Sequence, residues 1–255
     1  MRVWPVFKKE VRLYFTSPVA YVVFTIFLVI SGYFFSSIFA FFSLMSMQAT
    51  MNPAFARDLS VTEGIMRPLF SNISVVMLLL VPILTMRLFA EEKKSGTIEL
   101  LLTYPVRDGE VLIGKYVAAF VLYLVMLAAT GLYPAMLVRF ARLEWGPLLT
   151  GYLGLVLMGG AFLAVGVLAS SLTENQIVAA VATFGALLIF WVIGWSADFA
   201  GPGWGKLLSH LSILEHFDSF AKGVIDTKDM IYYLNFTILA LFLTLRSLES
   251  KRWRG

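Results

Sequence analysis

Cysteine is absent from this chain of 255 residues, and charged residues are scarce, at 14% of the sequence. Without cysteine there is no disulfide framework, no thiolate nucleophile and no cysteine-ligated metal. Soluble proteins average about 25% charged residues, so this content is low for a chain surrounded by water. Hydrophobic residues make up 59% of the chain, and 22 Phe and 11 Met exclude a disordered polypeptide. These values indicate a membrane protein.

The hydrophobic residues are gathered into six long runs. A transmembrane helix needs roughly 20 mainly apolar residues, because every backbone N–H and C=O must be bonded within it. Six segments qualify: 19–42, 68–86, 112–138, 148–172, 176–197 and 230–245. Pro82 and Pro134 lie inside two of them and are expected to bend them. We predict an all-α polytopic membrane protein whose residues 1–255 form one transmembrane domain.

Ionisable residues are missing from the centres of all six segments. Ion-coupled carriers and pumps usually need such residues, and an intramembrane hydrolase needs a nucleophile with a base. The sequence GEVLIGKY at 109–116 resembles a phosphate-binding loop, but bulky Val111, Leu112 and Ile113 entering a helix cannot cradle phosphate. A carrier is therefore disfavoured and an enzyme more so. We expect no catalytic residue, cofactor or metal on this chain, and any ATP use on another chain.

The distribution of Lys and Arg predicts the orientation. The N-terminus, the segment between the second and third spans (in which we count Lys115) and the C-terminus together hold 13 of the 20 basic residues, and the other side holds 7. Both termini are therefore expected in the cytoplasm, as an even number of spans requires.

Residues 1–17 have the pattern of an amphipathic helix ended by Ser17-Pro18. Trp4 and Phe7 recur at helical spacing with Val11 and Tyr14, while Lys8, Lys9 and Arg12 lie off that stripe. Two compatible interpretations remain: a helix on the inner leaflet with its basic side toward headgroups, or a positively charged flank of the first span.

The segment 87–104, RLFAEEKKSGTIELLLTY, is expected to be the longest cytoplasmic loop. Gly96 interrupts it, and a short helix with an apolar face is expected to follow, capped by Thr97 and begun with Glu99. That face needs either the bilayer surface or a groove on a partner protein. The residue types alone leave these two open.

Residues 198–229 are too many for a simple connector on the outer side. Trp204, Leu207, Leu208, Leu211 and Leu214 have helix-like spacing, and Phe217 and Phe220 follow. We expect one or two short helices that lie on the outer leaflet or re-enter it. The two histidines of the chain, His210 and His216, are interpreted as surface groups and not as a metal site. Small residues fill the fourth and fifth spans, and packing within the bundle is favoured over a subunit interface.

The sequence from Phe89 to Pro105, with Gly114-Lys115 after it, resembles the signature of ABC-2 type permeases. The similarity extends to the Lys9-Glu10 helix, the six spans and the long outer segment, and so covers essentially the whole chain. Residues 211–217, Phe220, 222–226 and 229–233 are similar, more narrowly, to gliding-motility-associated and copper-processing-associated permeases.

The resemblance implies a role for each part. Residues 1–17 would be an elbow helix at the membrane surface, with Trp4, Phe7, Lys8, Lys9 and Arg12 in contact with the bilayer. Residues 89–104 would be a coupling segment that docks an ATPase subunit through Glu91, Glu92, Gly96, Thr97, Glu99 and Leu102. Leu211, Leu214, Phe217 and Phe220 would form an outer gate. ATP and Mg²⁺ would be bound by partner subunits.

The sequence is therefore interpreted as the permease subunit of an ATP-driven transporter, of exporter type, in the inner membrane of a bacterium. Expected partners are cytoplasmic ABC ATPases, a second or homologous permease, a periplasmic protein and the lipid bilayer, with no nucleic acid. Two alternatives stay open: a membrane component of a mechanical, gliding-type assembly through which nothing is transported, and a stand-alone carrier or channel.

Overall fold

The computed structural model describes residues 3–51, 60–97, 107–199 and 201–252, and every regular element among them is helical. The elements are α1 (Val3–Thr16), α2 (Pro18–Met51), the π-helix η2 (Thr62–Met66), α3 (Arg67–Thr85), α4 (Arg87–Lys94), α6 (Asp108–Ala129), α7 (Leu132–Leu137), α8 (Trp145–Leu172), α9 (Gln176–Val192), the 3-10 helix η3 (Ile193–Phe199), α10 (Gly201–Leu211), α11 (Ile213–Ala221) and α12 (Thr227–Arg252).

Six stretches of the described residues are long and apolar enough to cross a membrane. They are Pro18–Gln48, Thr62–Lys94, Asp108–Leu137, Trp145–Leu172, Gln176–Ser196 and Thr227–Ser250. The predicted all-α polytopic fold with six spans is confirmed.

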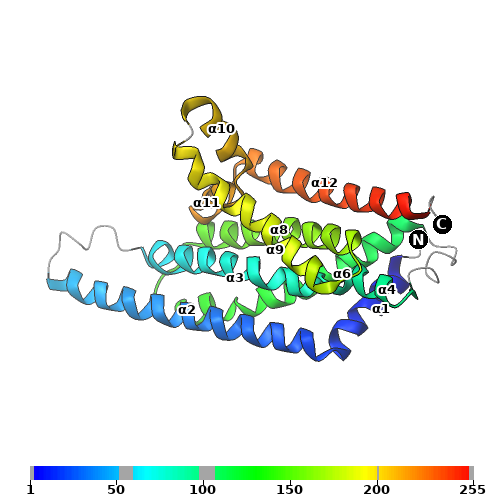
Figure 1. Ribbon diagram of the computed structural model, residues 1–255. Helices are drawn as coiled ribbons and strands as arrows, with labels where there is room; N and C mark the ends of the chain where they lie inside the picture. The colour runs from blue at the N-terminus through cyan, green and yellow to red at the C-terminus, as the bar shows by residue number, and fades with distance from the viewer. Residues whose placement is uncertain (1–2, 52–59, 98–106, 200, 253–255) are drawn as a thin grey trace.

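The long helices lie alongside one another, and both ends of the chain lie at the same end of the bundle (Figure 1). We call this the terminal end; α1 and α4 are found there. At the opposite end, which we call the far end, α11 packs against the bundle and α10 projects sideways from it (Figure 1). The two short helices before the last span were expected from the sequence.

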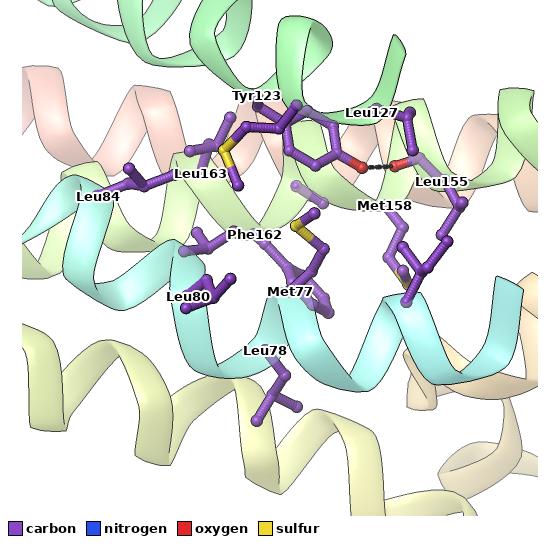
Figure 2. Close-up of a cluster of buried hydrophobic side chains, with 14 of the residues drawn as sticks. Met77, Leu78, Leu80, Leu84, Tyr123, Leu127, Leu155, Met158, Phe162 and Leu163 are labelled. Atoms are coloured by element: carbon purple, nitrogen blue, oxygen red, sulfur yellow. Dashed lines mark hydrogen bonds between the residues drawn. The ribbon is translucent and has the colours of Figure 1, made fainter. Parts of the chain in front are cut away.

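Helix α8 lies at the centre of the bundle, packed against α3, α6, α9, α11 and α12. Its glycines allow neighbouring helices to approach closely, since Gly159 lies against the Tyr123 ring and Gly166 against Thr85. Figure 2 shows the resulting contact, in which the Tyr123 hydroxyl donates a hydrogen bond to the carbonyl oxygen of Leu155. The small residues of the fourth span therefore serve packing within the bundle, the interpretation that the sequence favoured.

The second span does not end where a loop was predicted. Helical structure continues from Thr62 to Lys94, interrupted only by a turn at Met86, so that residues 87–94 are the helix α4. Pro82 precedes the turn and has no N–H to donate to the carbonyl of Leu78. The side chain of Ser170 from α8 bonds to the chain at this turn: its hydroxyl accepts from the N–H groups of Phe89 and Ala90 at 3.0 and 3.1 Å and donates to the carbonyl of Met86.

The third predicted span is two helices. It breaks at Thr130-Gly131, between α6 and α7, four residues before Pro134. Because Pro134 offers no N–H to the carbonyl of Thr130, that carbonyl accepts instead from Tyr133 at 3.0 Å. The first and last spans are longer than the predicted ranges, extending to Gln48 and from Thr227.

Candidate functional site

Helix α1 packs against α6 at the terminal end of the bundle. A Cβ atom at Gly114 would lie 2.9 Å from the side chain of Val6 and 3.3 Å from the backbone nitrogen of Phe7, so only glycine permits this approach. The apolar stripe of α1 from Phe7 to Tyr14 is used in this packing, Tyr14 being buried, while Trp4 stays 68% exposed beside the Phe7 ring. The stripe predicted for a membrane-surface helix therefore faces the protein over most of its length.

A cluster of four charged side chains joins α1, α4 and α6. The ammonium group of Lys115 lies 2.7 Å from Glu10 and 3.0 Å from Glu92, and that of Lys9 lies 2.7 Å from Glu92. The side chain of Lys115 is only 1% exposed, and those of Glu10 and Glu92 are 7% and 12% exposed. We call these four residues the charge cluster. Two positive and two negative groups make it neutral overall, which is the condition for keeping such groups inside a protein.

Lys9 is the solvent-facing member, with 48% of its side chain exposed. Partial burial alone would lower the pKa of Lys9, but its hydrogen bond to Glu92 and the charges of Glu92 and Glu10 raise it above its ordinary value. Lys9 was expected to face lipid headgroups; the structure instead directs its ammonium group to a carboxylate.

A cleft of about 500 Å³ lies beside the charge cluster, between α1 and α4. Its floor carries Glu10, Tyr14 and Lys115, and its rim carries Lys9, Arg87, Glu91, Glu92, Ser95 and Thr97. Among the residues that the structure describes, this cleft borders the part of α4 that belongs to the predicted coupling segment.

The C-terminal end of α1 is bonded to the second span by a separate set of contacts. The buried hydroxyl of Tyr14 donates to the carbonyl of Leu84 at 3.0 Å. The guanidinium of Arg87 lies 5.0 Å from the centre of the Tyr14 ring and donates to the hydroxyl of Ser17 at 2.8 Å. Burial raises the pKa of Tyr14 well above its ordinary value, so its hydroxyl stays protonated and remains a donor.

Helix α4 is also fastened to α8. Besides the Ser170 contacts, the buried ammonium group of Lys93 donates to the carbonyl of Ser171. One short helix of eight residues is therefore linked to α1 and α6 by charge and to α8 by hydrogen bonds. A movement imposed on α4 would be transmitted to three helices of the bundle.

The residues predicted to dock a partner occupy different positions in this arrangement. Gly96 bends the chain as expected, with a φ of +68° that favours glycine. Glu91 and Thr97 are exposed at the cleft, whereas Glu92 points into the charge cluster. Glu99 and Leu102 lie outside the described residues. On α1, Lys8 and Arg12 are exposed.

Sequence reasoning missed Glu10 and misjudged Lys115. Lys115 was counted as a loop charge, but it is buried within α6 because Glu10 and Glu92 neutralise it there. A signal for Glu10 was present: it lies three residues from Phe7 and four from Tyr14, on the packed face of its helix. Nothing in the local sequence around Lys115 indicates its partners.

The predicted outer gate residues lie on α10 and α11, or close to them. Phe217 and Phe220 are buried, and a Cβ at Gly154 of α8 would lie 2.7 Å from Phe220. Leu214 is half-buried and Leu211 is 37% exposed. Their role as a gate stays a prediction.

The interpretation of His216 as a surface group was wrong. Its side chain is only 6% exposed, because Asp229 and the Tyr232 ring provide a polar and an aromatic partner inside the fold. No group of three or more His, Asp or Glu residues within the described ranges is arranged to hold a metal ion.

Comparison with known proteins gives one match. A family model described as "ABC-2 family transporter protein" matches residues 4–252. No curated protein matches the chain.

Proposed function

The chain belongs to the ABC-2 family of transporter proteins and is thus a permease subunit of an ABC transporter; we propose that it works as an exporter driven by ATP hydrolysis on partner subunits. The family implies an associated ABC ATPase. We place that ATPase at the terminal end, which we assign to the cytoplasm of a bacterium because it carries most of the basic residues. Two permease chains, alike or homologous, would stand above two ATPases.

The observation that carries this proposal is the attachment of α4. The segment 89–104, which begins within α4, was predicted to dock the ATPase, and α4 is bonded to α1, α6 and α8. A domain that pushes on residues 95–104 would therefore move α4 as a lever and carry three helices with it. The spans would switch between two packings whose balance nucleotide binding changes.

The six residues predicted to dock the ATPase then fall into two groups. Glu91, Gly96 and Thr97, with Glu99 and Leu102 beyond them, would touch the ATPase: the acids would pair with basic groups, Gly96 would set the direction and Leu102 would fill a groove. Glu92 would act within the permease, holding α4 to Lys115 and Lys9. The exposed Trp4, Lys8 and Arg12 of α1 would contact the inner leaflet.

The absence of cysteine makes a direct test possible, because one introduced thiol is the only thiol in the chain. A bifunctional cross-linker is attached to the thiol of Thr97→Cys in membranes that also contain the partner ABC ATPase. We expect a cross-linked band of the combined mass. The matched control is Lys206→Cys, exposed on α10 at the far end, which should give none. A cross-link from residue 206 and not from 97 would overturn the proposal.

A further inference from the structure

The far end of the bundle holds a buried histidine–carboxylate pair that the proposed function does not use. His216 is on α11 and Asp229 is in the first turn of α12, and the Nδ1 of the imidazole lies 2.6 Å from Oδ1 of the carboxylate. The two side chains are 6% and 1% exposed. The other ring nitrogen, Nε2, lies 3.0 Å from the backbone carbonyl of His210, which is in the last turn of α10. Three helices therefore meet at one imidazole ring.

These two contacts fix the number of protons at the site. A carbonyl oxygen can only accept, so Nε2 must carry a hydrogen to donate to His210. In a neutral imidazole Nδ1 is then an acceptor, and an ionised Asp229 facing it is an acceptor too. Two acceptors 2.6 Å apart cannot form a hydrogen bond. The observed geometry therefore requires one additional proton, shared by Nδ1 of His216 and Oδ1 of Asp229.

The surroundings make the loss of that proton costly. The second carboxylate oxygen of Asp229, Oδ2, is buried and accepts no hydrogen bond within the part of the chain that the structure describes. A neutral imidazole has only one N–H, so without the proton the ring loses one of its two contacts, either to the Asp229 carboxylate or to the His210 carbonyl. An ionised carboxylate without a donor is strongly disfavoured inside a protein, and an open contact lets water in.

Other titratable groups lie near the pair. The Tyr232 ring stacks on His216 with centroids 3.9 Å apart, but its hydroxyl and that of Tyr233 donate to the carbonyls of Leu211 and Ile213. Asp226 and Lys228 pair with each other at 3.0 Å, and their charges also act on His216 and Asp229 respectively. Glu215 of α11 points toward Gly194 of η3, and α8 has no charged residue or histidine in its sequence. The His210 ring lies 5.3 Å from that of His216.

We propose that His216 and Asp229 form a proton-binding site whose proton holds α10, α11 and α12 together, and whose loss releases them. The site senses the compartment at the far end, opposite the charge cluster. It stands independently of the proposed function, since it depends only on contacts between these three helices. Because the closed contact needs the additional proton, it is closed at acidic pH and opens as pH rises.

Pulsed EPR on the full chain in lipid nanodiscs tests this. Nitroxides at Leu207→Cys on α10 and Ile231→Cys on α12, both half exposed, report the separation of the two helices. We expect a narrow distance distribution at pH 5 and a broader, longer one at pH 9. An unchanged distribution between these two pH values overturns the proposal.

Two variants assign the response to this pair. Asp229→Asn places an amide N–H where the shared proton lies, so the distribution should stay narrow at both pH values. His210→Gln removes the other imidazole while keeping the backbone carbonyl that accepts from His216, so the response should persist. A pH-dependent change of the distance in Asp229→Asn equal to that of the wild type would contradict the assignment to this pair. So would the loss of that change in His210→Gln.

A second measurement needs no variant. The chain has only two histidines, so histidine-selective ¹⁵N labelling gives two ring systems. The ring resonances of one histidine should change over the same pH range as the EPR distance. Ring resonances that stay constant while the distance changes would show that the pair is not the proton site.

Discussion

The ammonium group of Lys115 lies 2.7 Å from the carboxylate of Glu10, although 105 residues separate them in the chain. The contact joins the short N-terminal helix α1 to the third span. Because Glu92 of α4 binds the same ammonium group at 3.0 Å, one buried cation connects three elements at the end of the bundle where we place the ATPase.

Removing the cation alone should be costly. Lys115→Met leaves the buried Glu10 with only the more distant Lys9, 3.8 Å away, and breaking a buried ion pair from one side costs about 3–5 kcal/mol. We expect a marked fall in the thermal midpoint of the detergent-purified chain. The double variant Glu10→Gln/Lys115→Gln keeps the Lys9–Glu92 pair and removes both partners, so it should recover most of the loss. A double variant as unstable as Lys115→Met would show that the pairing does not determine stability.

The hydroxyl of Ser170 should matter more than that of its neighbour. Ser170→Ala leaves the N–H groups of Phe89 and Ala90 without their acceptor, and each unsatisfied buried donor costs about 1–3 kcal/mol. Ser171→Ala is the matched control, because that hydroxyl bonds only a carbonyl of its own helix and should cost about 1 kcal/mol or less. Unfolding by SDS titration measures both. Equal losses would argue against Ser170 as the link between α4 and α8.

Gly96→Ala should impair docking without impairing folding. A φ of +68° costs a residue with a Cβ about 1–2 kcal/mol, so the segment after α4 would change direction. The added methyl group meets no neighbour within 4 Å among the residues that the structure describes, so the fold is spared. We expect normal membrane insertion and reduced copurification of the ATPase. Gly146→Ala, also in open space but in the first turn of α8, should leave copurification unchanged.

The ion pair between Arg67 and Asp218 should make the far end sensitive to acid. The two groups are 2.8 Å apart. Burial would raise the pKa of Asp218, but its hydrogen bonds to Lys222 and Arg67 and their charges lower it below its ordinary value. A lowered folded-state pKa gives stability that is present above about pH 4, the ordinary aspartate value, and is lost as pH falls below it. Thermal midpoints measured between pH 3 and 7 should fall less steeply for Arg67→Gln than for the wild type.

The six spans could be predicted because the length of an apolar run determines whether a helix can cross a bilayer. The bend at Gly96 was predicted for a similar local reason, since only glycine adopts that backbone conformation freely. These features depend on neighbouring residues in the chain.

The charge cluster could not be predicted, because its members lie far apart in the sequence. A lysine near the end of a span is ordinarily a solvated charge, and only the arrival of Glu10 and Glu92 makes burial of Lys115 favourable. Ser170 was interpreted as a small packing residue, and its role at the junction of α3 and α4 depends on hydrogen bonds to Phe89 and Ala90, which lie 81 and 80 residues away in the chain. Such roles follow from tertiary contacts that no periodicity records.

The central claim is that the charge cluster transmits ATPase movement from α4 to the spans. Glu92→Ala tests it, because α4 then loses its charge link to α1 and α6 but keeps its hydrogen bonds to α8. Lys115 keeps Glu10 at 2.7 Å as its partner. The control is Glu174→Ala, an exposed glutamate in the turn between α8 and α9.

The measurement is pulsed EPR in the reconstituted complex with the copurifying ATPase, using nitroxides at Leu44→Cys on α2 and Phe140→Cys after α7, which are 61% and 81% exposed. A non-hydrolysable ATP analogue should shift this distance in the otherwise unchanged chain and in Glu174→Ala. In Glu92→Ala the shift should be lost while the ATPase stays bound. A full shift in Glu92→Ala, with the ATPase bound, would contradict the account.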